Sequence, residues 1–195
     1  MRPVHYKARD GTDISGYLTA APGMSKNPLP LIVFPHGGPN KQTFWGYDPR
    51  VQFFVSRGYA VFQPNFRGSS GFGKKFQNAG DGQWGRGVMQ DDVSDGVKWL
   101  VEGGIADPRR VAIVGGSYGG FAALAGLAFT PDLFAAGVCL FGASDLGSFI
   151  REVPPKWKPM LGDLAVKIGN PDLPEDARRL AACRTEKPAP KTGFS

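Results

Sequence analysis

Cysteine and histidine are both scarce in this sequence. Its 195 residues include two cysteines, Cys139 and Cys183, and two histidines, His5 and His36. Two distant cysteines form neither a disulfide framework nor the spacing of a metal site, and they favour a reducing compartment such as the cytoplasm. We therefore expect no metal and no cofactor. Cys139 stands in the apolar run "AAGVCLFG", which predicts a small core residue.

Long hydrophobic runs, blocks of like charge and internal repeats are also missing. A membrane-spanning helix needs about 20 consecutive apolar residues, and the opening "MRPVHYKARDGT" is not typical of a signal peptide. The formal net charge is +6, but the basic residues are scattered, which favours a solvated surface over a binding patch. We expect neither nucleic acid nor a membrane as a partner.

What is present is typical of a globular protein. Hydrophobic residues make up 42% of the chain and charged residues 21%, and the length suits a single domain over residues 1–195. The last residues, 184–195, are polar and proline-rich, so we expect a disordered tail there.

Short apolar runs alternate with helix-like segments along the chain. After a hairpin at Asp10-Gly11, the expected strands are "LIVFP", "YAVFQPNF", "RVAIVGG" and "FAAGVCLFG", and the expected helices between them are "DPRVQFFVSRG", "QDDVSDGVKWLVEGG" and "SYGGFAALAGLAF". This order predicts an α/β fold with a mostly parallel sheet flanked by helices. From Asp145 onward we find no further strand and one expected helix, "PEDARRLAA".

One short motif carries nucleophile chemistry. Gly115-Gly116-Ser117-Tyr118-Gly119 matches G-x-S-x-G and lies between an expected strand and an expected helix, the context that this motif requires. A sharp turn there exposes the serine hydroxyl, and the N–H groups at the start of the helix face a developing oxyanion. The sequence therefore predicts Ser117 as a nucleophile.

A second motif complements the first. His36-Gly37-Gly38-Pro39 follows an earlier buried strand and has the form of an esterase oxyanion loop. The Gly38 N–H and the Tyr118 N–H are the expected oxyanion donors. His36 is expected to be a structural residue of the loop rather than a base.

Taken together, these blocks resemble the catalytic domain of the prolyl oligopeptidase family of serine peptidases, nearest the acylaminoacyl-peptidase and dipeptidyl-aminopeptidase branch. The matching stretches are "KARDGTDISGYL", "FPHGGP", "NFRGSSGFG", "QWGRGVMQDDVSDGVKWL" and "DPRRVAIVGGSYGG". The resemblance implies an α/β-hydrolase fold. It also implies an acyl-enzyme on Ser117, held by the Gly38 and Tyr118 amides and formed from a short peptide or small ester.

The sequence departs from this family in two places. No β-propeller sequence precedes the hydrolase hairpin, and no histidine follows Ser117. In α/β-hydrolases the acid and the histidine follow the serine. We therefore expect a C-terminally truncated domain that lacks its last strands, and we assign no triad acid or base.

Candidate substitutes for the acid and base are weak. Asp145 follows an expected strand, but a role as a helix cap is favoured over a role as the acid. His5 lies in the N-terminal hairpin and is expected to be remote. Low-weight alternatives elsewhere are a phosphate loop at Gly68–Lys75 and a metal pair at Asp91-Asp92; one of these aspartates is expected to pair with Arg67. Trp84 and Trp99 are expected to be packing residues.

Three functions remain open from the sequence. The chain is a serine hydrolase acting through Ser117, an inactive truncated hydrolase fragment, or a non-enzymatic binding module on the same fold. A sheet that stops after "FAAGVCLF" leaves an apolar edge strand, which predicts self-association unless "KWKPMLGDLAVKIG" covers it. Tyr118 and apolar residues around Phe149 are expected to line the acyl pocket.

Overall fold

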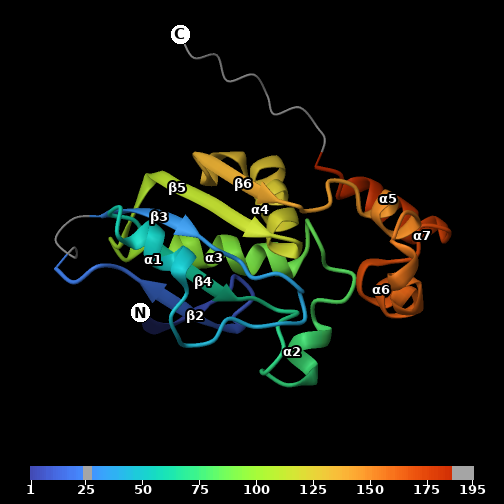
Figure 1. Cartoon of the computed structure of the whole chain (residues 1–195), viewed down its shortest axis with the longest axis horizontal. Helices are drawn as coiled ribbons and strands as arrows, with labels where there is room; N and C mark the ends of the chain where they lie inside the picture. Colours follow the sequence, from blue (N-terminus) through green and yellow to red (C-terminus); the bar gives the residue numbers. More distant parts are fainter. Residues whose placement is uncertain (24–27, 186–195) are drawn as a thin grey trace, which may run out of the picture.

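A six-stranded mixed sheet forms the centre of the molecule (Figure 1). The computed structural model describes residues 1–23 and 28–185. The strands lie in the order β1-β2-β4-β3-β5-β6, and their bounds are β1 Arg2–Lys7, β2 Asp13–Thr19, β3 Leu29–Val33, β4 Ala60–Asn65, β5 Ala106–Gly116 and β6 Ala136–Leu140. β1 and β2 are antiparallel, whereas β4, β3, β5 and β6 run parallel. The predicted α/β class with a mostly parallel sheet is confirmed.

Strand alternation distributes the apolar side chains of the sheet between two helical layers. Leu31 and Val33 of β3 pack in the larger core with α3 (Val88–Glu102) and α4 (Tyr118–Phe129). Ile32, which points the opposite way, packs in the smaller core with α1 (Pro49–Val55). α1 therefore covers one face and α3 and α4 cover the other (Figure 1).

The chain after β6 forms no further strand in the described residues, as expected, but it contains more helices than the one that the sequence predicted. It forms α5 (Leu146–Arg151), the 3₁₀ helix η3 (Pro155–Met160), α6 (Leu161–Ile168) and α7 (Pro174–Ala182); short helices α2 (Lys74–Asn78) and η2 (Pro131–Leu133) lie earlier. Figure 1 shows α5, α6 and α7 grouped beyond the carboxyl ends of the parallel strands. In the described part of the chain, no helix combines the length and apolarity needed to cross a membrane.

β6 lies at the edge of the sheet with its side chains partly open to solvent. Val138, Leu140 and the following Phe141 are 48%, 43% and 84% exposed. Cys139 is half-buried, so the prediction that it is a core residue was wrong, because an edge strand has no neighbour on one side. The expected cover, residues 156–169, forms most of η3 and α6, which pack with each other and with α5.

The predicted tail begins with two residues that make contacts. Arg184 forms an ion pair with Asp145, and the Thr185 N–H donates to the Ser144 carbonyl oxygen. The rest of that tail, residues 186–195, lies outside the described residues.

A buried ion pair joins the sheet to α3. Arg67, directly after β4, donates to Asp92 of α3 from its backbone N–H, its Nε and its Nη2, the last at 2.6 Å. The Asp92 side chain is fully buried and that of Arg67 is 8% exposed. The hydrogen bonds that Arg67 donates to Asp92 raise the pKa of the Arg67 guanidinium above its usual value. The expected pairing of one of the two aspartates with Arg67 is confirmed.

Replacing Asp92 with asparagine should destabilise the fold strongly. The change leaves the Arg67 guanidinium buried without its principal counter-charge, and breaking such a pair costs about 3–5 kcal/mol. The free energy of unfolding in urea measures the loss.

The matched control is Lys7→Ala, which removes an exposed pair with Asp13 whose side chains are 64% and 79% exposed. Its expected cost is below about 1 kcal/mol. Equal losses for the two variants would contradict the assigned role of the Arg67–Asp92 pair.

Candidate active site

Ser117 occupies the turn between β5 and α4 in a backbone conformation that L-residues rarely adopt. Its φ is 56° and its ψ −121°, and its side chain is exposed, whereas its neighbour Tyr118 is buried. A non-glycine residue with positive φ stores about 1–3 kcal/mol of strain and persists only where its surroundings impose it. The Ser117 N–H is held by the Leu140 carbonyl of β6 at 3.0 Å. The sharp turn expected from G-x-S-x-G is therefore present.

Close backbone packing imposes this conformation. A Cβ atom built on Gly115 would overlap the backbone of Gly119, and one built on Gly119 would overlap the Pro35 carbonyl oxygen. The first turn of α4 thus lies directly against both β5 and the segment after β3. Only glycine at positions 115 and 119 permits this approach.

The loop after β3 lies beside Ser117, as the sequence predicted. A Cβ atom on Gly37 would be 3.2 Å from the Gly116 carbonyl oxygen and 3.5 Å from the Ser117 Cβ. Gly38 adopts a φ of 126° and lines the same cavity as Ser117 and Tyr118. The structure therefore brings the two predicted motifs, which are separated by about 80 residues, to one place.

His36 fixes the orientation of this loop. Its Nδ1 donates to the Gly37 carbonyl oxygen at 2.8 Å, its Nε2 is 2.8 Å from the Ser69 hydroxyl, and its ring stacks on Phe66. Burial lowers the pKa of His36, which favours the neutral ring. Because the N–H and C=O of a trans peptide point opposite ways, holding the Gly37 carbonyl toward the ring turns the Gly38 N–H away from it.

The N-terminus of α4 supplies further N–H groups at the same point. The first hydrogen bond within the helix runs from the Phe121 N–H to the Ser117 carbonyl. The N–H groups of the residues between them have no partner within the helix, and the helix dipole places partial positive charge there. The Tyr118 ring packs on Trp84 and Phe66, and burial raises the pKa of its hydroxyl.

An apolar cavity of about 550 Å³ opens beside Ser117. It runs from Gly38, Ser117 and Tyr118 to the C-terminal helices, and Phe149 lies in its wall. Its other lining side chains are apolar or aromatic: Trp84, Phe121, Phe141, Ala143, Trp157, Met160 and Leu164. The cavity fits the side chain of an apolar acyl group.

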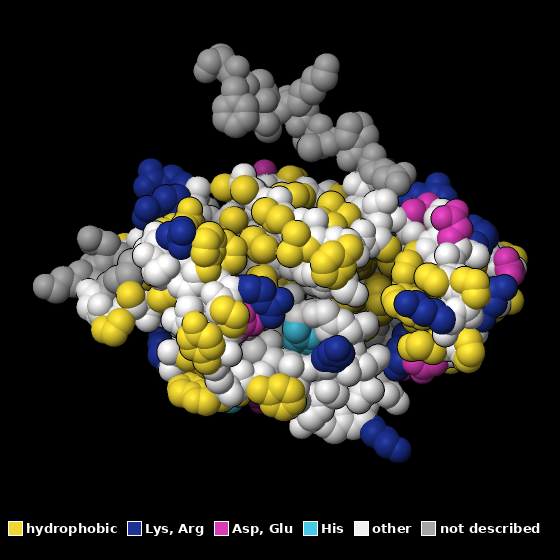
Figure 2. All heavy atoms as spheres, in the orientation of Figure 1, with side chains coloured by type: hydrophobic (Ala, Val, Ile, Leu, Met, Phe, Trp, Pro, Cys, Tyr) yellow, Lys and Arg dark blue, Asp and Glu magenta, His cyan; other side chains and the backbone are white. Residues whose placement is uncertain are grey.

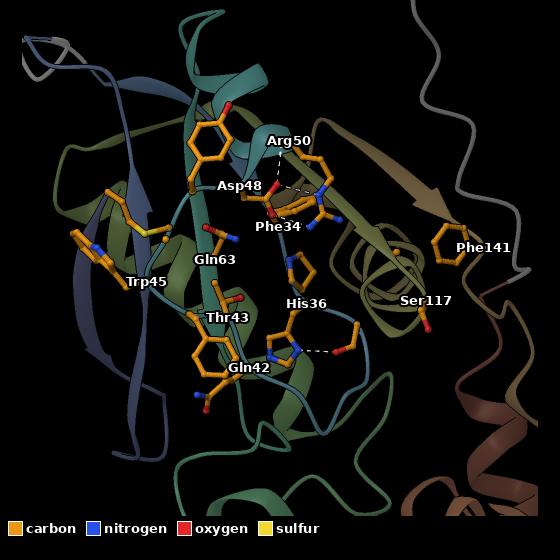
Figure 3. Close-up of a pocket in the computed structure, with 17 residues that line it drawn as sticks. Phe34, His36, Gln42, Thr43, Trp45, Asp48, Arg50, Gln63, Ser117 and Phe141 are labelled. Atoms are coloured by element: carbon orange, nitrogen blue, oxygen red, sulfur yellow. Dashed lines mark hydrogen bonds and ion pairs between the residues drawn. The ribbon is translucent and has the colours of Figure 1, made fainter.

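A second cavity of about 490 Å³ reaches Ser117 from the side of α1 (Figure 3). Ser117 and Phe141 border both cavities. Phe34, Gln63 and the residues before α1 form much of the second cavity's wall, and the rest is formed by Met1, Pro35, His36, Gly37, Arg50 and Gly116. The serine therefore stands between an apolar cavity and a more polar one.

Neither a base nor an acid reaches Ser117 within the described residues. No described side chain is hydrogen-bonded to its hydroxyl, and Figure 3 shows the His36 ring bonded within its own loop. His5 is exposed on β1, four strands from β5, which is about 19 Å at the usual strand spacing. Asp145 caps α5 by accepting from the Gly147 and Ser148 N–H groups, as favoured from the sequence.

The residues of the other candidate sites make ion pairs, begin a helix or pack against other side chains. Asp91 pairs with Arg9, and no group of three potential metal ligands occurs in residues 1–23 and 28–185. The two lysines that end the phosphate-loop candidate Gly68–Lys75 begin α2, a helix of five residues. Trp84 packs against Tyr118, and Trp99 stacks on Tyr6, as predicted.

Comparison with known proteins agrees with this geometry. Residues 45–159, more than half of the chain, match the model of the prolyl oligopeptidase family. The chain belongs to the prolyl oligopeptidase family. The resemblance inferred from the motifs is thereby confirmed, and with it the α/β-hydrolase fold.

The relatives and structural neighbours are peptidases and hydrolases. Dipeptidyl aminopeptidase BIII of Pseudoxanthomonas mexicana is 45% identical over 87% of this chain and 25% of its own length. A puromycin hydrolase crystal structure superposes with a TM-score of 0.85 at 28% identity, covering 94% of this chain and 28% of the other. An acylaminoacyl peptidase in complex with Z-Gly-Gly-Phe-chloromethyl ketone gives 0.81 at 25% identity, covering 94% and 29%. The chain spans about a quarter of the length of these proteins.

Sequence reasoning missed several residues of the site. Phe141 has a φ of 46° and separates the two cavities, but no pattern in the sequence marks it. Trp157 and Met160 lie in a proline-rich stretch without helical periodicity. Gln63 follows the alternation of β4 and carries no motif of its own.

Replacing Gly119 with alanine should disrupt the turn at Ser117. The added methyl group meets the Pro35 carbonyl, which is backbone and cannot move aside cheaply. Overpacking of this kind costs about 1–3 kcal/mol. Urea unfolding measures the effect.

Gly162→Ala is the matched control, because a Cβ atom there meets nothing within 4 Å and the residue lies inside α6. Alanine at a helix interior should raise stability by up to about 1 kcal/mol. A Gly119→Ala protein as stable as the wild type would contradict the close packing inferred here.

Proposed function

We propose that the chain carries the nucleophile of a prolyl-oligopeptidase-type serine hydrolase acting on a short peptide or a small ester. Ser117 Oγ attacks the acyl carbonyl carbon, and the Gly38 and Tyr118 N–H groups bind the oxyanion. The bond to the amine or alcohol then breaks, the leaving group takes a proton, and water hydrolyses the acyl-enzyme. Family membership supports this class of reaction.

The observation that carries the proposal is the backbone at Ser117. A serine at positive φ, exposed between β5 and α4 and beside the Gly37–Gly38 loop, has the geometry of an activated-serine turn. A non-enzymatic binding module would have no use for this strain. The adjoining apolar cavity supports an apolar acyl group, and the neighbour bound to a peptide chloromethyl ketone supports a peptide substrate.

The step that lacks a residue is deprotonation of the serine. A serine hydroxyl without a base is a weak nucleophile, and neither histidine of this sequence follows Ser117. Binding and oxyanion stabilisation do not need the base, so they persist without it. We propose the cytoplasm as the location, in keeping with two free cysteines.

Hydrolysis of p-nitrophenyl acetate by the wild-type chain and by Ser117→Ala tests the proposal. We expect the wild type to be faster, by no more than the roughly 10³–10⁴-fold over water that remains when a triad is incomplete. The variant should be slower than the wild type, because it lacks the attacking Oγ.

Equal rates for the two proteins would contradict a nucleophilic Ser117 in this chain. They would favour the inactive fragment or the binding module. A urea midpoint for the variant close to that of the wild type excludes misfolding as the cause.

We also propose that two copies of the chain associate through β6. The outer edge of β6 has no strand beside it in the described residues, and exposed edges pair with other chains. Figure 2 shows hydrophobic side chains over this part of the surface and around α1. Between them lies an apolar groove bordered by Phe53, Val114 and Leu140.

Replacing Val138 with lysine should weaken this association, since an inserted charge at an edge strand opposes pairing. Sedimentation velocity over a range of concentrations should show dimer for the wild type and more monomer for the variant. Val166→Lys, at a site on α6 that is 66% exposed against 48% for Val138, is the control. A wild-type chain that stays monomeric at all concentrations would contradict the proposal.

A further inference from the structure

The cavity on the α1 side of Ser117 contains a buried polar side chain without a partner. Gln63 is 4% exposed, and its Oε1 has no hydrogen-bond partner among the described residues. An unpaired buried polar atom costs about 1–3 kcal/mol, so such groups usually mark a place where something else binds. Gln63 lines the cavity that reaches Ser117 (Figure 3).

The fold explains why this glutamine faces the cavity. Val61 of β4 packs in the core under α1, and Gln63, two residues later, lies on the same face at the carboxyl end of the strand. β3 pairs with β4 and ends one residue before Phe34, and β5 pairs with the other side of β3 and ends one residue before Ser117. The strand register aligns Gln63 with Val114 of β5, three residues before Ser117, so the glutamine lies deeper than the serine in the cavity that both residues line.

A preformed loop makes the outer wall of the cavity. Asn65, itself buried, accepts from the Thr43 N–H at 2.8 Å and donates to the Thr43 carbonyl at 3.2 Å. The residues that follow, Phe44, Trp45 and Tyr47, are 69%, 62% and 81% exposed. Three exposed aromatic side chains in one short loop form an apolar rim of the kind that binds a ligand.

The side chains of Asp48 and Arg50, which line the cavity, pair with each other. The Arg50 Nε and Nη2 donate to the Asp48 carboxylate at 3.1 and 2.7 Å (Figure 3). The cavity therefore offers a neutral polar floor and an aromatic rim. This combination suits a peptide group with an apolar side chain better than a free carboxylate.

We propose that this cavity binds the amine-side residues of a peptide substrate, with the Gln63 carboxamide pairing with their backbone and the aromatic rim packing their side chain. The inference rests on the proposed function: an acyl group in the apolar cavity places the scissile bond at Ser117, and the leaving group must then lie on the other side. A carboxamide offers both a donor and an acceptor, as a peptide group does.

Two small probes, each carrying one half of a cleaved peptide, test the assignment without requiring turnover. N-acetyl-phenylalanine carries the acyl half and glycyl-phenylalaninamide the amine half. Amide chemical-shift titrations of the whole chain give a Kd for each. The variants are Gln63→Leu, which keeps the volume of the side chain, and Phe149→Ala in the apolar cavity as the matched control.

We expect Gln63→Leu to raise the Kd of glycyl-phenylalaninamide about threefold to tenfold, the effect of losing one or two hydrogen bonds. The Kd of N-acetyl-phenylalanine should stay within about twofold, since its cavity is untouched. Phe149→Ala should show the reverse pattern. Leucine also removes an unpaired buried oxygen, so the urea midpoint should not fall.

Three results would overturn the inference. They are an unchanged Kd for glycyl-phenylalaninamide in Gln63→Leu, an equal rise for both probes, and no binding of that amide to the wild type. If Phe149→Ala still weakens N-acetyl-phenylalanine in those cases, the acyl cavity of the proposed function stands and only the amine-side assignment fails. If Phe149→Ala has no effect on N-acetyl-phenylalanine, the acyl cavity is wrong and both proposals fall.

Discussion

The contact on which the site depends is the close packing of three backbone segments around Ser117. β5, the first turn of α4 and the Pro35–Gly38 loop approach so closely that a methyl group at Gly115 or Gly119 would overlap main-chain atoms. Main-chain atoms in regular elements cannot move aside independently. The turn is therefore held at positive φ by its neighbours, and the serine hydroxyl is exposed where two loops meet.

From that contact the division of the site into two cavities follows. Ser117 ends a central strand, so there is open space on both sides of it above the sheet. On one side the helices after β6 supply apolar walls, and on the other β4 and the loop before α1 supply Gln63 and an aromatic rim. An acyl-transfer reaction has the same asymmetry, because an acyl group and a leaving group separate at the attacked carbon.

The sequence predicted the elements that rest on local patterns. Strands, helices, the serine turn and the loop at His36 each have their signal within about ten residues, and the pairing of Arg67 with an aspartate followed from charge at a helix start. What could not be predicted depends on long-range placement. Cys139 was expected in the core because its run is apolar, but burial also needs a neighbouring strand, which β6 lacks on one side. Gln63 and Trp157 become site residues only when the chain brings them to Ser117.

The contacts that hold Ser117 at positive φ set the geometry of the site, but they do not make the serine hydroxyl a strong nucleophile. The contacts that hold the turn are main-chain contacts made by Gly37, Gly115 and Gly119, together with the hydrogen bond to Leu140, and none involves a base. The orientation of the Gly38 N–H depends in turn on His36, which bonds to the Gly37 carbonyl and does not act on the serine. In the proposed function, the positions of the cavities and of the proposed oxyanion donors are therefore set by the described fold itself, while the nucleophilicity of Ser117 requires a proton acceptor that this packing does not provide. The proposed function therefore predicts that binding and acylation can be measured as independent quantities.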